Sequence, residues 1–506
     1  MKYYISPQEG QIRLKKIRHK IYKELLSLEA NVSNKKISSL LSSGDTEQRV
    51  FETKFLNYDF SKQRITEEIL EYLLTIPDQL GLKVALSKLV DGKFLNPSEK
   101  TFASHTLYRS PVPKKNTGHI ISERKNIKSF INNIKTTSQF KNIICICIGG
   151  SRLGPEFLTE FKPASSKIKL YFCSSYDLLE LEDALHNCNQ KETLIIISSK
   201  SFKTIEVLHN LERVKSWFKD YKGLNIEDHV YAISSDVVAM KAAGIDDSNQ
   251  FKILDSIGGR FSLWSSMSLP AFVLSEYENY SSLLEGAYLA DQHTISSPWS
   301  TNIPMIMALL SVWNSAALNI SNHGIFTYNF RLRSLTRYLT QLSMESNGKT
   351  VNFHNEESPF PTSPLIWGGY GIEAQHSTFQ WLMQGKIKNS CDFIAVNDKD
   401  KKNLNSHQML LSQVLALTHG EENIKKPYKS IEGNNPCSII QLNSMDFRSL
   451  GFLLAIYENK VFIESQILGI DPFDQWGVEL GKRLTIKSKE NDFLAKSFTR
   501  AFLPKL

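Results

Sequence analysis

Four segments of this sequence place a charged side chain beside glycines or uncharged polar residues, where it can project into a cleft with little crowding. They are 255–264 with Arg260, 341–349 with Glu345, 368–376 with His376, and 471–482 with Lys482. A carboxylate, an imidazole or an ammonium can exchange a proton, and a guanidinium stabilises developing negative charge. Each segment taken alone also suits a surface ion pair, a helix-end carboxylate, a structural histidine or a solvated helix face. No single segment therefore decides a function.

Two further segments have residue types that bind anions. Gly149–Pro155 follows an apolar run that ends at Ile148, and Ser198–Thr204 follows another at 193–197. The first matches neither a P-loop nor GxGxxG, but its glycines and a following helix N-terminus suit a phosphate. The second offers hydroxyls and a lysine. If the preceding strands are parallel neighbours, both turns lie at one sheet edge, where α/β proteins bind ligands. The alternative for each is an ordinary solvated turn.

The elements that must position these segments alternate between short apolar runs and helix-like stretches. Strand-like runs lie at 141–150, 167–173, 193–199 and 228–234, and again at 323–330, 391–397 and 437–444. This alternation predicts two α/β domains built on parallel sheets. Before residue 100, apolar residues recur at spacings of three and four in 12–30 and 66–77, which predicts amphipathic helices.

The composition, with 41% hydrophobic and 22% charged residues, excludes a disordered, collagen-like or coiled-coil chain. Sixty basic against 52 acidic residues give a net charge of +8, which leaves anionic partners open. We expect no nucleic-acid partner, since no zinc-ligand set or recognition motif is present. Residues 292–330 contain no Asp, Glu, Lys or Arg, but Pro304 and several polar residues interrupt the run, which favours a buried helix over a membrane span. Six cysteines without a CxxC pair predict buried thiols in a reducing compartment.

Taken together and in this order, the six segments resemble the glucose-6-phosphate isomerase (phosphoglucose isomerase) family. The strongest matches are GGRFSLWS at 258–265, MESNGK at 344–349 and DQWGVELGK at 474–482, while GGSRLGP, SKSFKT and AQH are looser. The matches extend from about residue 96 to residue 482. The resemblance implies an α/β fold: two sugar-isomerase (SIS-type) α/β/α sandwich domains with mostly parallel sheets and helical N-terminal and C-terminal additions.

The domain boundaries that follow are 1–115 for a helical N-terminal segment packed on the larger domain, 116–275 for a smaller SIS-type domain with the phosphate-binding loops, 276–490 for the larger SIS-type domain, and 491–506 for a C-terminal tail. The N-terminal ten residues lack an apolar signal core. With this resemblance we expect a cytoplasmic enzyme of glycolysis and gluconeogenesis that has no membrane partner.

The resemblance also implies an aldose–ketose isomerase that interconverts glucose 6-phosphate and fructose 6-phosphate through an enediol, without metal or other cofactor. By similarity Glu345 is the base that moves the proton, Arg260 is the cation near the developing oxyanion, and His376 and Lys482 open the sugar ring. The similarity assigns substrate binding to Gly150, Ser151, Ser199, Lys200, Ser201, Thr204, Gly259, Gln341 and Gln475. The family supplies the histidine from the neighbouring subunit, so a homodimer with His376 contributed across the interface is implied.

The sequence departs from the family pattern at several positions. Arg152 replaces the usual aspartate and adds a positive charge near the expected phosphate, while Val207 lacks a hydroxyl. The loop at 368–375 is altered, and Thr101 stands where the family has arginine. We expect these changes to affect loop geometry and substrate affinity rather than the reaction. The alternatives are a non-catalytic sugar-phosphate-binding regulator on the same fold, or an isomerase of another hexose phosphate.

Overall fold

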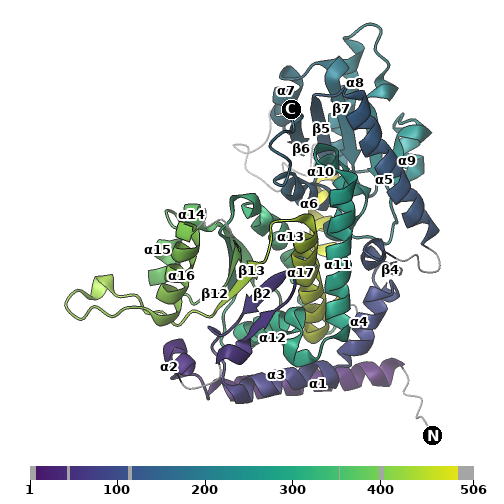
Figure 1. Cartoon of the computed structure of the whole chain (residues 1–506). Coiled ribbons are helices and arrows are strands. Elements are labelled where there is room, and N and C mark those ends of the chain that lie inside the picture. Colours follow the sequence, from purple (N-terminus) through teal and green to yellow (C-terminus); the bar gives the residue numbers. More distant parts are fainter. Residues whose placement is uncertain (1–6, 43–45, 112–116, 353, 398–403, 488–506) are drawn as a thin grey trace.

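Two main sheets organise the chain in the computed structural model, which describes residues 7–42, 46–111, 117–352, 354–397 and 404–487 (Figure 1). The smaller sheet has the order β6-β5-β7-β8-β9, and all its neighbouring strands are parallel. Its strands are β5 (Asn142–Cys147), β6 (Lys169–Cys173), β7 (Thr193–Ser198), β8 (Val230–Ser234) and β9 (Gln250–Lys252).

Successive residues of the smaller sheet point to opposite faces, as strand geometry requires. Ile143, Cys145 and Cys147 face one hydrophobic cluster together with residues of α5 and α6. Ile144 and Ile146 face a second cluster, which α7, α8 and α9 complete. The flanking helices are α5 (Gly118–Thr137), α6 (Gly150–Thr159), α7 (Leu179–His186), α8 (Ile205–Lys219) and α9 (Val237–Ala242). The predicted buried cysteines of this strand therefore share one face of an α/β/α sandwich.

The larger sheet has the order β1-β2-β13-β12-β10-β11. Its strands are β1 (Val50–Glu52), β2 (Leu56–Asp59), β10 (Asn322–Thr327), β11 (Leu365–Tyr370), β12 (Ser390–Val396) and β13 (Cys437–Leu442). The four strands β13, β12, β10 and β11 are parallel, and β2 joins β13 in the antiparallel sense. The N-terminal segment thus contributes strands to this sheet, which its helical spacing did not reveal.

Helices cover both faces of the larger sheet. One face packs on α14 (Gly371–Ala374), α15 (Phe379–Gln384) and α16 (Leu404–His419). The other face packs on α12 (Ile303–Ala316), α13 (Leu335–Asn347) and α17 (Phe447–Leu468). The remaining strands and helices are β3 (Phe94–Asn96), β4 (Thr101–Ala103), α1 (Pro7–Glu29), α2 (Ile37–Ser42), α3 (Glu67–Gln79), α4 (Leu82–Val90), α10 (Leu269–Leu274), α11 (Tyr277–Ser296) and α18 (Glu479–Lys487).

Helices α11 and α17 pack side by side along the middle of the molecule (Figure 1). Their backbones touch at glycines: a Cβ on Gly451 would lie 2.0 Å from the carbonyl oxygen of Leu283. Only glycine allows so close an approach. Every residue of α12 except Ser311 is buried, which confirms the predicted buried helix. None of the helices in the described ranges is long and apolar enough to cross a membrane.

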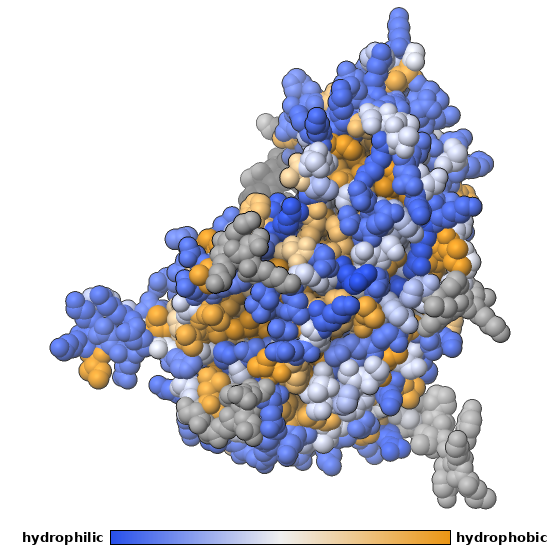
Figure 2. Space-filling view, viewed as in Figure 1, coloured by the Kyte–Doolittle hydropathy of each residue, from blue (hydrophilic) through white to orange (hydrophobic). Residues whose placement is uncertain are grey.

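Between α16 and β13 the chain leaves the body of the molecule as an arm, residues 421–432 (Figure 1). An antiparallel bridge between Glu421 and Ile431 holds its two sides together. Figure 2 shows a mostly hydrophilic surface on the arm with a hydrophobic spot near its end. The predicted C-terminal tail lies outside the described residues, and the boundaries at 115, 275 and 490 stay predictions.

Candidate active site

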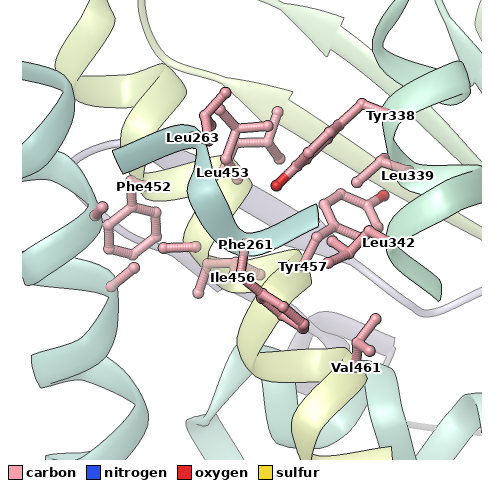
Figure 3. Close-up of a cluster of buried hydrophobic side chains, with 14 of the residues drawn as sticks. Phe261, Leu263, Tyr338, Leu339, Leu342, Phe452, Leu453, Ile456, Tyr457 and Val461 are labelled. Atoms are coloured by element: carbon pink, nitrogen blue, oxygen red, sulfur yellow. The ribbon is translucent and has the colours of Figure 1, made fainter. Parts of the chain in front are cut away.

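Helix α13 carries two of the predicted site residues on one face. Its buried face includes Tyr338, Leu339 and Leu342, which point into a core shared with α17 and with Phe261 and Leu263 (Figure 3). Gln341 and Glu345 are four residues apart and lie away from that buried face. The packing of this helix therefore fixes the direction in which the carboxylate points.

The 3-10 helix η6 (Gly259–Trp264) brings Arg260 to the same place, and it touches the start of α6. A Cβ on Gly150 would lie 2.2 Å from the backbone carbon of Gly259 and 2.4 Å from the nitrogen of Arg260. A Cβ on Gly149 would lie 3.5 Å from Nε2 of Gln341. Gly149 and Gly150, at the end of the smaller sheet, therefore lie directly against the residues that surround the carboxylate.

Arg260 is buried, and its guanidinium holds several partners. Nε donates to Ser346 Oγ at 2.7 Å, Nη1 donates to Gln475 Oε1 at 2.9 Å, and Nη2 donates to the carbonyl oxygens of Pro472 and Asp474. Burial lowers the pKa of Arg260 from its ordinary value, against the opposing effect of Glu345 and other carboxylates. These bonds account for four of the five N–H groups of an arginine. Among the described residues the second N–H of Nη1 has no hydrogen-bond acceptor.

The Glu345 carboxylate is the nearest acid to this guanidinium. Its Oε2 lies 3.7 Å from Arg260 Nη1, and its side chain is 25% exposed, so a ligand can reach it. Gln341 Nε2 donates to the same oxygen at 2.9 Å. The other amide atom, Gln341 Oε1, is buried without a hydrogen-bond partner in the described structure. A partly open base and a buried cation thus lie side by side, and together they can bind and deprotonate a polyhydroxylated ligand.

A second cation, Lys349, lies beside this group. Its Nζ donates to the carbonyl oxygen of Ser346 at 2.7 Å and to that of Asp471, and it pairs with Asp474 Oδ1 at 3.1 Å. Burial lowers the pKa of Lys349 and raises the pKa of Asp471 to about 6. The sequence motif included Lys349, but nothing in the spacing of charges pointed to this contact.

The predicted phosphate loops share one edge of the smaller sheet. Strands β5 and β7 are parallel neighbours, and Cys147 pairs with Ser198, so the turns after them leave from the same end. Ser199 Oγ lies 3.2 Å from Thr204 Oγ1, and Ser151 is buried at the start of α6. The N-termini of α6 and α8 both begin in these turns, where free N–H groups and helix dipoles favour an anion.

Hydrogen bonds from residues at and just after the end of β8 hold the backbone of the loop from Ser199 to Thr204. The carbonyl oxygen of Lys200 accepts hydrogen bonds from the hydroxyls of Ser234 and Ser235. The Lys200 ammonium lies 4.0 Å from Asp255 and stays partly exposed, while Ser201 is exposed. The backbone of this loop is therefore held in place, while the side chains of Lys200 and Ser201 stay open to a ligand.

Arg152 does not supply the free charge that the sequence predicted near the phosphate. Its guanidinium pairs with Glu156 at 3.1 Å and with Glu180 at 3.0 Å, and it also donates to Ser174. These carboxylates raise the pKa of Arg152 and neutralise its charge. The expectation is corrected because the sequence could not show that two acids on α6 and α7 surround this arginine.

His376 and Lys482 are not brought into contact with Glu345. His376 is exposed in the link between α14 and α15. Lys482, on α18, is 65% exposed and pairs with Glu479 of its own helix at 2.7 Å. Their predicted roles in ring opening stay predictions. The altered loop before His376 is also different from expectation, because residues 368–370 belong to β11 at the edge of the larger sheet and residues 371–374 form α14.

Two α/β/α sandwiches, with helix N-termini suited to an anion beside a carboxylate–guanidinium pair, define a double-domain protein of the sugar-isomerase (SIS) type. The family model described as phosphoglucose isomerase matches residues 59–498. The chain belongs to this phosphoglucose isomerase family, and the predicted family and fold class are confirmed.

Relatives and a solved structure agree with this assignment. A glucose-6-phosphate isomerase of Acinetobacter venetianus is 35% identical over 502 residues, which cover 90% of each chain. That of Pseudoalteromonas translucida is 34% identical over 494 residues, which cover 89% of this chain and 90% of the relative. The crystal structure of a glucose-6-phosphate isomerase from Chlamydia trachomatis matches with a TM-score of 0.86, 28% identity and 96% coverage of both chains.

Proposed function

We propose that this chain interconverts glucose 6-phosphate and fructose 6-phosphate, and that Glu345 moves the proton between the two adjacent carbons. The reaction follows from membership of the phosphoglucose isomerase family, whose curated relatives extend over nine-tenths of the chain. The role of each residue is our assignment. It rests on one observation above all: the partly open Glu345 carboxylate lies 3.7 Å from a buried guanidinium.

The proton transfer divides into two half-reactions on the open-chain sugar. Glu345 takes the proton from C2 of the aldose, and the electron pair forms the enediol as the C1 oxygen gains a proton. Glu345 then returns its proton to C1 while the C2 hydroxyl loses its proton and becomes the carbonyl. Negative charge develops on the oxygens during both halves. The unused N–H of Arg260 stabilises that charge, and Gln341, which lies beside Glu345, binds a sugar hydroxyl.

The phosphate of the substrate is bound, in this proposal, by the turns after β5 and β7. The set comprises Gly150, Ser151, Ser199, Lys200, Ser201 and Thr204. Two helix N-termini and one lysine suit a dianion without any metal. Gly259 and Gln475 bound the other side of the ligand, since Gly259 lies next to Gly150 and Gln475 bonds to Arg260.

Ring opening is assigned to His376 and Lys482, with His376 supplied by a second copy of the chain. His376 is exposed and forms no contact with Glu345 within the described chain. Several apolar side chains are exposed on the arm and around α18: Ile424 and Tyr428, at 83% and 72%, and Trp476, Val478 and Leu480, at 62%, 48% and 54%. Exposed apolar residues of this kind support a homodimer that covers them. We also propose a cytoplasmic enzyme, in line with six free cysteines.

Turnover of fructose 6-phosphate, coupled to oxidation of the glucose 6-phosphate product, tests the proposal. We expect saturable activity in the purified chain and much lower kcat/KM with mannose 6-phosphate. A folded protein that binds fructose 6-phosphate without converting it would instead be a sugar-phosphate-dependent regulator. A preference for mannose 6-phosphate would assign the same chemistry to another hexose phosphate.

A further inference from the structure

One buried cation, Arg260, and one partly buried cation, Lys349, join α13 to the segment that follows α17. This segment, Asp471–Gln475, is called the 471–475 segment below. Arg260 bonds to Ser346 on α13 and to the carbonyl oxygens of Pro472 and Asp474. Lys349 bonds to the Ser346 carbonyl and to the same segment at Asp471 and Asp474. Lys349 has no assigned role in the reaction as proposed above, yet it links the same two pieces of backbone as Arg260.

Each N–H group of the Lys349 ammonium has an acceptor. It has three N–H donors and three acceptors: one carbonyl oxygen at the end of α13, one carbonyl oxygen in the 471–475 segment, and the Asp474 carboxylate. The side chains of Lys349 and Asp474 are only 17% and 10% exposed. A screened surface pair contributes little, whereas a partly buried pair that also bonds to backbone fixes its neighbours.

Each of the two pieces of backbone carries a residue that lies against Nη1 of Arg260. The last turn of α13 carries Glu345, and the 471–475 segment carries Gln475, which accepts from Arg260. The distance between these pieces sets where the base stands relative to the guanidinium. A displacement of about 1 Å in a catalytic group can lower a rate by about 100-fold. A residue that fixes this distance therefore influences kcat without touching the substrate.

We propose that Lys349 is a positioning residue: through Ser346, Asp471 and Asp474 it holds the end of α13 against the 471–475 segment and so places Glu345 for proton transfer. This inference rests on the isomerase function proposed above. The competing explanation is that Lys349 only caps the C-terminus of α13, where a cation is favoured in any helix. Capping alone would change stability and leave the chemistry of the folded enzyme unchanged.

Steady-state kinetics of Lys349→Met, Asp474→Asn and the double variant separate these explanations. We expect kcat for fructose 6-phosphate to fall about 10- to 100-fold in Lys349→Met, with KM within about threefold, because the phosphate-binding turns are intact. Asp474→Asn is expected to lower kcat in the same direction. The double variant should lose less than the product of the two single losses, since both act through one ion pair. In Lys349→Met alone, the Asp474 carboxylate is left buried without its partner, which destabilises the fold. The double variant removes this carboxylate as well, so it is expected to fold even if the single variant does not.

Lys62→Met is the matched control. Lys62 is 19% exposed and pairs with Asp59 at 2.6 Å beside β2, away from the proposed active site. It should lose stability to a comparable extent and keep its kcat. A wild-type kcat in folded Lys349→Met, or strictly multiplicative losses in the double variant, would overturn the positioning role. Absence of turnover in the natural chain itself would instead refute the proposed function, so the two failures are distinguishable.

Discussion

At the residue scale, the proposed chemistry depends on which N–H groups of Arg260 are bonded within the protein and which one is left for a ligand. Four N–H groups are committed to Ser346, Gln475 and two backbone carbonyls, and these hold the guanidinium rigidly in a buried place. A preorganised cation of this kind stabilises charge without having to move during the reaction. The remaining N–H is on Nη1, the nitrogen nearest to Glu345.

Asp471 gives this site a pH-dependent stability. Burial raises the pKa of Asp471 to about 6, while Asp474, Lys349 and Arg260 lie close to it. The unfolded chain releases this proton near pH 3.8, so the folded state loses stability as pH rises through about 4 to 6. The contribution is therefore present in acid and lost at neutral pH, in contrast to the usual salt-bridged aspartate.

Asp471→Asn is predicted to remove that loss, because the amide resembles the neutral acid. We expect the free energy of unfolding of this variant, relative to the natural chain, to rise by about 2 kcal/mol between about pH 4.5 and about pH 8. Urea denaturation followed by fluorescence at both pH values measures it. A relative stability that stays constant or falls with pH would contradict the raised pKa.

At the element scale, the first turn of α6 and η6 are joined by a glycine contact. The short distance between Gly150 and the backbone of Gly259 leaves no space for a side chain. This contact places the end of the smaller sheet that is proposed to bind phosphate directly against Arg260, which lies on η6. In the proposed binding mode, this backbone contact sets the separation between the phosphate-binding turns and Arg260.

Gly150→Ala is predicted to damage both stability and catalysis. Its Cβ would meet the backbone of Gly259 at 2.2 Å, which forces α6 and η6 apart. Overpacking of this kind costs about 1–3 kcal/mol, and the shift of Arg260 should lower kcat about 100-fold. Gly118→Ala, at the start of α5 with no atom within 4 Å of its Cβ, is the control. Equal melting temperatures and kcat values in the two variants would show that the contact is dispensable.

Much of this architecture was predictable from local pattern. Seven apolar runs predicted seven strands, because strands buried on both faces read as continuous Val, Ile, Leu and Cys. β11 was missed since Gly368 and Gly369 suggested a turn, and its edge position requires little hydrophobicity. The short strand β2 was missed because it pairs with β13, far along the chain, and β1 was missed because it only extends the sheet by pairing with β2.

The candidate site also contains some features that local sequence predicts and others that it does not. That Glu345 and Arg260 belong to one site was predicted through motifs, and the structure places the two side chains 3.7 Å apart. The pairing of Arg152 with Glu180 on the next helix, and the link that Lys349 makes to Asp474, join residues separated by 28 and 125 positions. Contacts of that kind arise only when the tertiary fold brings distant segments together, so no pattern along the chain reveals them.

At the scale of the whole molecule, the predicted sharing of His376 between subunits makes the dimer part of the active site. Exposed apolar residues on the arm and around α18 support such an assembly. The net charge of +8 gives the molecule a modest field that attracts dianionic substrates. Arg152 contributes less to it locally than its type suggests, since two carboxylates surround it.

Mixing two inactive variants tests the shared site. Glu345→Gln and His376→Ala chains should each be nearly inactive alone. After joint unfolding and refolding in equal amounts, about half of the dimers are mixed, and each mixed dimer has one complete site built from the two natural residues. We expect about a quarter of the natural activity to return. No recovery, in a mixture shown to contain mixed dimers, would place both residues of a site on one chain.

The central claim is that Glu345 moves the proton, and the most direct measurement is the turnover and binding of fructose 6-phosphate by Glu345→Gln. The amide keeps the shape of the carboxylate but cannot act as a base, so we predict that kcat falls at least about 1,000-fold. The dissociation constant measured by calorimetry should stay within about fivefold, because the phosphate-binding turns are unchanged. Glu182→Gln, on the surface of α7 and paired with Arg213, should keep full activity. A folded Glu345→Gln enzyme with turnover within tenfold of the natural chain would contradict the assignment.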